Sequence, residues 1–333
     1  LNAEQGQVPL ALPAIDFRQK IADPMLGGNL MFQANTLALL RNDGQDTQRA
    51  FAGAQWDLKR LTGMGQVVTL TALVRGDVYN TNDILATTTP SYRGTEGWTT
   101  RGIATAAIDI EWPFVGEAFG GTQVFKPRLQ LVASPKIKNL AVPNEDARAI
   151  DLEDSNLFAL NRFPGYDRVE DGSRLTWGVD WELQRPGWRI KSTIGQSFRL
   201  DQPTPGLFPV GTGLSEQVTD FVGRTEVRFR NLVSFTHRFR LDKDNFAVRR
   251  NEVDATIGSR RTYLEFGYLR LDRNIATVED LRDREELRAA ARLAVGRKWS
   301  VFGSGVFNLT DREEDPVFLP DGFQPIRTRL GVA

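Results

Sequence analysis

Apolar and polar side chains alternate along most of this chain. From residue 175 to residue 183, one parity is apolar and the other is polar or glycine. Between residues 224 and 230 the pattern is sharper, because every second position is charged; these positions are Arg224, Glu226, Arg228 and Arg230. Alternation of this kind is typical of a β-sheet with one apolar and one polar face. The four charged residues are therefore predicted to face a polar interior.

The same alternation predicts fifteen strands. Most are 9–14 residues long, whereas strands of globular proteins have about 5–6 residues. A tilted strand that crosses a lipid bilayer needs about 9–11 residues. The predicted strands are residues 12–20, 29–40, 49–60, 66–79, 101–112, 123–133, 173–184, 188–200, 220–230, 232–241, 246–257, 261–271, 285–296, 297–309 and 326–333.

Residues 285–292 are the one stretch where a helix competes with a strand. They are rich in Ala, Glu and Arg, which favour a helix. Their apolar positions are nevertheless spaced by two residues, which favours a strand. We therefore predict a strand here.

The connections between the predicted strands alternate in length. Tight turns at 61–65 and 185–187 contrast with long connections at 81–100, 134–172 and 201–220. Outer-membrane barrels have short periplasmic turns and longer external loops, and they alternate apolar outward with polar inward residues. The predicted fold class is therefore all-β: an antiparallel transmembrane β-barrel over residues 1–333, with the charged residues facing its lumen.

Composition excludes several other classes of protein. The chain has 333 residues with 42 basic and 42 acidic side chains, whereas nucleic-acid-binding proteins usually show a basic excess. No nucleic-acid partner is therefore predicted. The absence of cysteine and the presence of one histidine exclude a disulfide scaffold and a zinc–thiolate site within this stretch, and no metal site is predicted. The sequence has no run of 18 apolar residues that would predict a transmembrane helix.

No motif for catalysis or cofactor binding stands out. Acidic residues gather between residues 145 and 171; they could serve a calcium site or a glycosidase pair, but their spacing matches no calcium loop. Arginines interleave with them, which favours a solvated or lumen-facing polar network. We predict no enzymatic activity and no cofactor.

Aromatic residues gather near the ends of predicted strands. A girdle of partly hydrated aromatic side chains at the lipid–water boundary is typical of membrane barrels. In a soluble β protein, the same side chains would form a core or a surface on which sugars stack. The residues concerned are Trp98, Trp112, Phe114, Trp188 and Trp299.

The most distinctive stretch runs from Ser134 to Gly172, between two predicted strands. Its motif residues are Pro143, Asn144, Glu145, Asp146, Asp151, Asp154, Asn156, Leu157, Phe158, Asn161, Arg162, Phe163, Gly165, Tyr166, Asp167, Arg168, Glu170 and Gly172. This stretch resembles the LPS-assembly protein family LptD, whose outer-membrane barrels carry a sequence motif of this form. Residues 195–197, 220–224 and 322–329 also resemble that family.

The resemblance implies a barrel of 26 strands that delivers lipopolysaccharide (LPS) to the outer leaflet of the outer membrane in a Gram-negative bacterium. It implies four partners: LPS itself, the plug lipoprotein LptE, the periplasmic bridge protein LptA and outer-membrane lipid. Fifteen strands are too few for such a barrel, so we expect this chain to be its C-terminal part, without the periplasmic jelly-roll domain. The family's usual disulfides cannot form through this segment, because it has no cysteine.

Two structural roles follow from the resemblance as expectations. The barrel of the family opens sideways between its first and last strands, so the lateral-gate strand here is 326–333, with Pro325 before it and Arg327 and Arg329 within it. Proline removes donors from a strand ladder, and Pro316 and Pro320 precede the same strand. The long connection 134–172 is expected to be lumen-facing or extracellular, and to brace the wall where it folds into the lumen.

Two other classes of function stay open on the sequence. A porin-like or receptor channel for small solutes would share the barrel but lack the motif between residues 134 and 172. A soluble β-sheet protein that binds or hydrolyses polysaccharide would use the acidic cluster. Extraction separates them, because a barrel needs detergent and a soluble protein does not.

Overall fold

The computed structural model describes residues 5–22, 26–272, 283–310 and 322–332. Sixteen strands form one antiparallel sheet. The strands are β1 Leu10–Ala22, β2 Asn29–Leu40, β3 Asp46–Leu61, β4 Val67–Asn82, β5 Gly97–Glu111, β6 Phe114–Ala118, β7 Gly121–Ala133, β8 Arg174–Arg185, β9 Trp188–Arg199, β10 Phe221–Phe229, β11 Val233–Leu241, β12 Val248–Gly258, β13 Tyr263–Leu271, β14 Arg284–Val295, β15 Trp299–Asn308 and β16 Gln324–Val332. The helical turns are η1 Gln5–Gln7, η2 Ile84–Ala86, α1 Pro90–Arg93 and η3 Asn139–Ala141.

The prediction of an all-β, antiparallel fold is confirmed, and each of the fifteen predicted strands is present. The segment that could have been a helix is strand β14. Among the described residues, no helix has the length and apolarity needed to cross a membrane.

The sixteenth strand, β6, was missed because a proline separates it from β5. Glu111 of β5 pairs with Arg128, and Phe114 of β6 pairs with Phe125, so both strands follow one register along β7. Pro113, which has no backbone N–H, interrupts the ladder between them. The connection 113–122 between the predicted strands 101–112 and 123–133 is therefore mostly strand, and its turn is Phe119 and Gly120, both with positive φ.

The end strands of the sheet run in the same direction. The path from β1 to β16 contains fifteen strands, with β6 beside it, and therefore fourteen antiparallel pairings. An even number of reversals leaves β16 parallel to β1. In the described part of the chain, each of these two strands pairs with a single neighbour.

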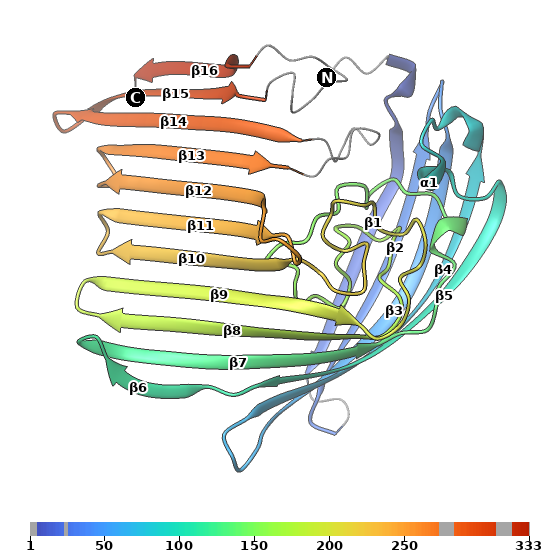
Figure 1. The fold of residues 1–333 in the computed structure, drawn as a ribbon. Coiled ribbons are helices and arrows are strands. Elements are labelled where there is room, and N and C mark those ends of the chain that lie inside the picture. The colour runs from blue at the N-terminus through green and yellow to red at the C-terminus, as the bar shows by residue number, and fades with distance from the viewer. Residues whose placement is uncertain (1–4, 23–25, 273–282, 311–321, 333) are drawn as a thin grey trace.

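The sheet curves strongly, with β1–β5 forming one side and β7–β16 the other (Figure 1). The connections 134–172 and 200–220 lie on its concave side. They supply most of a buried apolar cluster consisting of Ala147, Ile150, Leu152, Leu157, Phe163, Leu207, Phe208, Leu214 and Val222. The core of the described protein is therefore built from loops that pack against the inside of the sheet.

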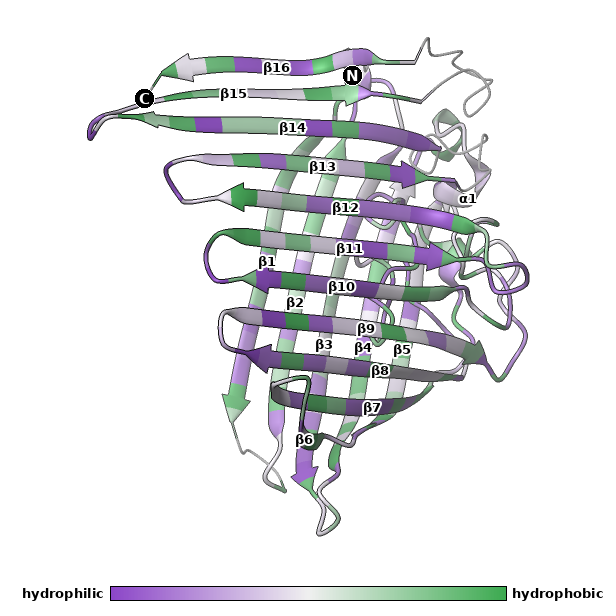
Figure 2. Ribbon diagram, turned by 60° about the vertical axis from the view of Figure 1, so that its left-hand side comes forward, coloured by the Kyte–Doolittle hydropathy of each residue, from purple (hydrophilic) through white to green (hydrophobic). Residues whose placement is uncertain are grey.

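The convex face of the sheet is apolar and exposed. Ile257, Leu264 and Leu293 are 58%, 64% and 58% exposed, and bands of opposite hydropathy alternate along the strands (Figure 2). Contiguous exposed apolar surface marks an interface with another apolar phase. Four of the five predicted girdle residues lie at the short-turn end of the sheet, and Trp98 lies at the other end.

Candidate functional site

The connection between β7 and β8, residues 134–172, is called here the internal segment. Its two ends are joined by a pair of backbone hydrogen bonds, each 3.1 Å long, between Ser134 and Gly172. From this closed base the segment reaches side chains of strands on both sides of the curved sheet. It gathers the residues of the predicted motif on the concave face.

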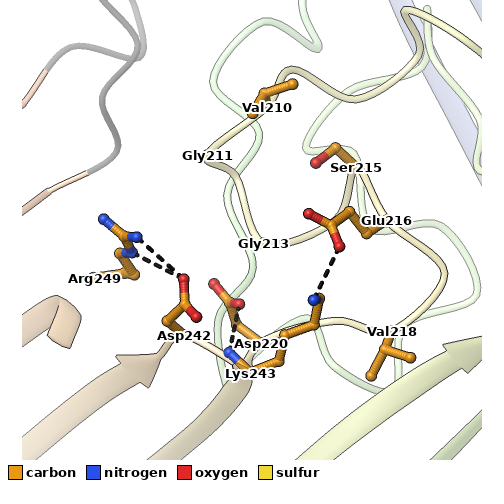
Figure 3. A pocket seen from close by; sticks show the side chains of 10 residues that line it. All are labelled: Val210, Gly211, Gly213, Ser215, Glu216, Val218, Asp220, Asp242, Lys243 and Arg249. Atoms are coloured by element: carbon orange, nitrogen blue, oxygen red, sulfur yellow. Dashed lines mark hydrogen bonds and ion pairs between the residues drawn. The ribbon is translucent and has the colours of Figure 1, made fainter. Parts of the chain in front are cut away.

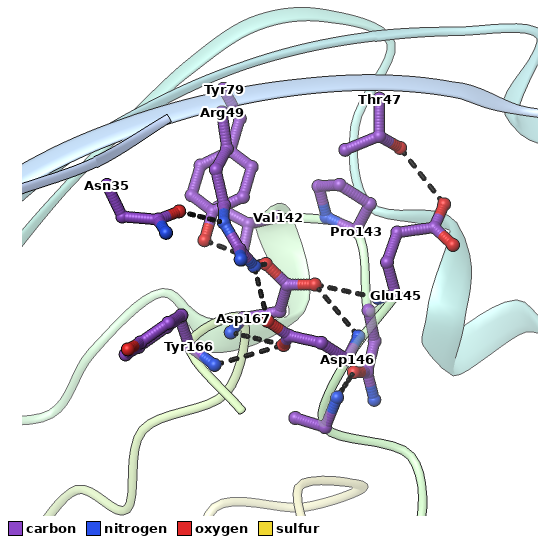
Figure 4. A network of polar contacts seen from close by, with 12 residues as sticks. Asn35, Thr47, Arg49, Tyr79, Val142, Pro143, Glu145, Asp146, Tyr166 and Asp167 are labelled. Carbon is purple, nitrogen blue, oxygen red and sulfur yellow. Dashed lines mark hydrogen bonds and ion pairs between the residues drawn. The ribbon is translucent and has the colours of Figure 1, made fainter. Parts of the chain in front are cut away.

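Asp167 is fully buried and joins the internal segment to β3 and β4 (Figure 4). Its Oδ1 accepts hydrogen bonds from Arg49 Nη1 at 2.6 Å and from Tyr79 Oη at 3.1 Å. Its Oδ2 accepts from the backbone N–H of Glu145 at 2.7 Å. Burial opposes ionisation of Asp167, but Arg49 and the backbone donor outweigh it and lower the pKa of this carboxyl group.

Asp146 closes a tight turn beside Asp167. Its Oδ1 accepts from the backbone N–H groups of Tyr166 and Asp167 at 3.0 and 3.1 Å, and its Oδ2 lies 2.6 Å from Arg49 Nη1. Burial and the neighbouring charge of Asp167 raise the pKa of Asp146. Arg49 is thus shared by two carboxylates, and its charge together with the backbone donor at Asp167 favours ionisation of Asp167 over Asp146.

Tyr166 contacts the first two strands of the sheet. Its hydroxyl group donates to Asp16 Oδ2 at 2.8 Å and accepts from Gln33 Nε2 at 2.7 Å. Its carbonyl oxygen accepts from Arg75 at 2.7 Å and from Arg101 at 3.1 Å. Tyr166 and Asp167 together therefore join the internal segment to β1, β2, β3, β4 and β5.

The start of the motif is held by charged and polar contacts. Glu145 pairs with Arg41 at 2.8 Å, and Asn144 Oδ1 accepts from the N–H of Ala147 at 3.0 Å. Arg168 donates to the carbonyl oxygens of Val142 and Pro143 at 2.9 and 3.1 Å. Burial lowers the pKa of Arg168 to about 10, and the charge is compensated by Asp167 and by these carbonyl dipoles.

Glu170 is the centre of a second buried cluster, on the other side of the sheet. Its oxygens lie 2.7 Å from Arg199 Nη2 of β9, 3.5 Å from Arg162 and 3.5 Å from Arg174 of β8. Burial opposes ionisation of Glu170, but the three guanidinium groups outweigh it and lower the pKa of Glu170. Burial also lowers the pKa of Arg162 to about 9.

Asn161 aligns the C-terminal end of the motif. Its Oδ1 accepts from the N–H of Glu170 at 3.0 Å, and its Nδ2 donates to the carbonyl oxygen of Arg168 at 3.0 Å. The amide side chain of Asn161 therefore binds the backbone of both Arg168 and Glu170. The charged groups of these two residues belong to the buried clusters on opposite sides of the sheet. This contact fixes the relative position of the two buried clusters.

Asp151 and Asp154 connect the internal segment to β10, β11 and β12. Asp151 pairs with the fully buried Arg240, and Asp154 lies 3.9 Å from Arg224. Asn156 donates to the carbonyl oxygen of Asp151 at 2.7 Å and so fixes the turn between the two carboxylates. Burial raises the pKa of Asp154.

The four charged residues predicted to face the lumen separate into two groups. Glu226 of β10 pairs with Arg224 and lies 3.7 Å from Arg228, so these three form one row on the strand. Arg230 lies after the end of β10, in the turn, with its guanidinium carbon 5.3 Å from the centre of the Phe229 ring. It is not part of the row.

The predicted gate strand is β16, at one end of the sheet. Pro325 stands opposite Phe307, where the register of the ladder shifts. Arg327 and Arg329 lie on the same parity, opposite Val306 and Ser304, and both are exposed. Pro316, Pro320 and Ala333 lie outside the described residues.

A small cavity of about 220 Å³ lies between the connection 200–220 and the β11–β12 turn (Figure 3). Its two cations are each paired with a carboxylate: Lys243 with Glu216 at 3.0 Å and Arg249 with Asp242 at 3.1 Å. The cavity is therefore close to charge balance and presents no unpaired cation to an anionic ligand.

The sequence profile of the family "LPS transport system D" (LptD) matches residues 1–308. The chain belongs to the LptD family. Among curated relatives, the LPS-assembly protein LptD of Aromatoleum aromaticum is 29% identical over 136 residues, which are 38% of this chain and 17% of the relative. That of Albidiferax ferrireducens is 25% identical over 167 residues, 48% of this chain and 20% of the relative. The matched region thus spans about a fifth of the length of these LptD proteins.

Several residues that hold the motif in this LptD chain were not predicted from sequence. They are the strand partners Arg49, Tyr79, Arg101, Arg199 and Arg240. Each is a polar residue at a strand position, so strand alternation could have placed it on the polar face. Its partner in the internal segment could not be found in this way, because the pairs are far apart in sequence.

Gly165 allows the LptD motif to make its tight turn. A Cβ atom at this position would lie 2.2 Å from Asp146 Oδ1 and 2.4 Å from the Asp146 carbonyl oxygen. We expect Gly165→Ala to lower the free energy of unfolding by about 1–3 kcal/mol, the usual cost of overpacking. The measurement is the urea midpoint of the purified full-length protein in detergent micelles. Gly102→Ala is the control, since a Cβ there meets no atom within 4 Å.

Acidic pH should weaken the attachment of the internal segment. Glu170 and Asp167 have pKa values below their ordinary 4.5 and 3.8, so their contribution to stability is present at neutral pH and is lost as the pH falls through the folded-state values. The urea midpoint should be similar at pH 7 and pH 5 and should fall below about pH 4.5. Glu170→Gln should have a lower midpoint at pH 7 and a smaller fall in acid; an equal fall would contradict this assignment.

Proposed function

We propose that this chain forms part of the wall of an outer-membrane β-barrel that transports LPS and releases it into the outer leaflet. The observation that carries the proposal is the family match over residues 1–308. Transport rather than catalysis is the proposed activity, and the proposed partners are LPS, the plug lipoprotein LptE, the bridge protein LptA and membrane lipid. The proposed location is the outer membrane of a Gram-negative bacterium.

The two faces of the sheet support a position in the membrane. Exposed apolar side chains on the convex face suit contact with acyl chains, and paired charges on the concave face suit a hydrated interior. Because β1 and β16 run in the same direction, they cannot close an antiparallel barrel with each other. This supports a larger barrel that includes further strands, such as the 26-stranded barrel expected from the resemblance.

The internal segment is proposed to brace the wall from within the lumen. It contacts strands from β3 to β11 through charged groups that are buried together with their partners, and it contacts β1 through the exposed hydrogen bond between Tyr166 and Asp16. Such contacts hold a curved sheet at a fixed curvature, because separating them would leave charges without partners. An LPS head group, which is anionic and hydrated, could then pass a polar surface whose shape is kept constant.

Depletion of the full-length protein in its host tests the proposed function. Newly made LPS should then fail to reach the cell surface and should accumulate on the periplasmic side, as measured by surface labelling after pulse synthesis. Re-expression of the wild-type protein should restore delivery. A version in which residues 134–172 are replaced by a Gly/Ser linker should not. Undiminished surface delivery during depletion would contradict the proposed function.

A lateral gate at β16 gives a separate prediction. Pro325→Ala restores a backbone donor at the irregular end of the ladder with β15, so we expect the edge to open less often. A photo-crosslinker at Leu330, which is 86% exposed, should form fewer LPS adducts in this variant. Pro186→Ala in the β8–β9 turn is the matched control, and equal adduct yields in both variants would exclude the role of Pro325.

A further inference from the structure

Four consecutive hairpin turns at the short-turn end of the sheet share one composition. Each carries two exposed cations and no acidic residue. The four turns join β8 to β9, β10 to β11, β12 to β13 and β14 to β15, so they lie side by side along one edge of the wall (Figure 1). The eight cations, called here the basic rim, are Arg185, Arg189, Arg228, Arg230, Arg260, Arg261, Arg297 and Lys298.

Six of the eight cations of the basic rim have no carboxylate partner among the described residues. Arg189 and Arg228 lie 2.8 and 3.7 Å from glutamates, and Arg261 donates to two backbone carbonyl groups of the next turn. Within the described residues, no carboxylate oxygen lies within 4 Å of the charged groups of the remaining five side chains, namely Arg185, Arg230, Arg260, Arg297 and Lys298. The edge therefore bears a net positive charge that the described residues do not neutralise.

An aromatic ring accompanies the cations in every one of these turns. Trp188 and Phe229 from neighbouring hairpins pack with their ring centres 4.6 Å apart. Tyr263 and Trp299 occupy the equivalent places in the other two turns, and Trp299 is 64% exposed. Such rings favour the boundary between hydrocarbon and water, and long basic side chains beside them extend toward charged head groups.

The rim is continuous with the apolar outer face. Ile257, Leu293 and Val295 are each more than half exposed and lie within two residues of the strand ends that lead into these turns. Neighbouring hairpins are about 10 Å apart, twice the spacing of adjacent strands. That distance is close to the Debye length of about 8 Å at physiological ionic strength, so the four pairs of cations act partly together.

We propose that the basic rim binds the head groups of anionic phospholipids in the leaflet at the short-turn side of the barrel. This inference rests on the proposed membrane location. For the six cations other than Arg189 and Arg228, which lie within β9 and β10, the order of layers along each hairpin is apolar face, then ring, then cation. This matches the order of acyl chain, interface and phosphate in a lipid leaflet. An acidic protein would explain the cations but not this order.

Quenching of tryptophan fluorescence by brominated lipids tests the proposal. The full-length protein is reconstituted in phosphatidylethanolamine vesicles that contain equal fractions of brominated phosphatidylglycerol or brominated phosphatidylcholine. The signal of Trp188 and Trp299 is obtained as the difference from the W188F/W299F protein. One cation near an anionic surface changes local affinity about fivefold, so the anionic lipid should quench more strongly, and high salt should remove the difference.

Two variants separate charge from side-chain structure. R185Q/R260Q/R297Q/K298Q should lose the preference for the anionic lipid, and R185K/R260K/R297K/K298R should keep it. Equal quenching by both lipids in the wild-type protein would overturn the proposal, as would crosslinking of the rim to an acidic protein without lipid preference. Quenching by neither lipid would instead show that the wall does not enter the bilayer, and the proposed function itself would fail.

Discussion

Glu170→Ala should lower the free energy of unfolding by about 3–5 kcal/mol, the usual effect of breaking a buried ion pair. The carboxylate is fully buried, and it is shared by three guanidinium groups, those of Arg162, Arg174 and Arg199. Its removal leaves three buried cations together without their counter-ion. Those cations cannot reach water unless the internal segment separates from β8 and β9.

Urea unfolding of the full-length protein in detergent micelles measures this effect. Glu216→Ala is the matched control, because Glu216 is 66% exposed and pairs with Lys243 at the surface. Such pairs contribute about 0–1 kcal/mol. A loss of less than about 1 kcal/mol for Glu170→Ala would contradict the central place of Glu170 in the cluster.

Asp167→Ala should produce a loss of similar size on the opposite side of the sheet. It removes the acceptor of Arg49 and Tyr79 and of the N–H of Glu145. A buried arginine, a buried phenol and a buried amide then lose a partner, and we expect a loss of about 3–5 kcal/mol. Limited proteolysis should also detect cleavage within residues 134–172 that the wild-type protein resists.

The control for this variant is Asp244→Ala. Asp244 is 74% exposed and pairs with Lys243, so it should change the urea midpoint and the cleavage pattern little. Equal resistance to proteolysis in Asp167→Ala and Asp244→Ala would show that Asp167 does not hold the internal segment. Wild-type behaviour of Asp167→Asn would show that its negative charge is not required.

The strands could be predicted from sequence because one physical period, two residues, governs almost the whole sheet. Even β14, which is rich in alanine, forms a strand, as the two-residue spacing of its apolar positions predicts, and not the helix that its composition favours. Prediction failed at β6, where Pro113 breaks the pattern, and at the ends of β3, β4 and β5, which continue three or four residues into polar sequence. Strand ends depend on pairing with neighbours, which a single chain's pattern does not reveal.

The candidate site could be predicted only in part. The motif residues between 143 and 170 could be identified by their resemblance to the LptD family. The fold of the internal segment could not be predicted, because its apolar and polar residues follow no regular repeat. Its contacts are set by strands far away in the chain; Arg49 and Asp167, for example, are 118 positions apart. The placement of Arg230 in a turn also depends on where β10 ends, which alternation alone did not show.

Cysteine labelling along β14 tests most directly whether the wall has lipid on its convex face and water on its concave face. The chain has no cysteine, and Ala289, Ala290 and Ala291 are small residues on alternating faces of this strand. We predict that, in native membranes, a water-soluble maleimide labels A290C, whereas A289C and A291C react only with a lipid-soluble maleimide. Equal labelling of all three by the water-soluble reagent, or the opposite parity, would contradict a wall with lipid outside and water inside.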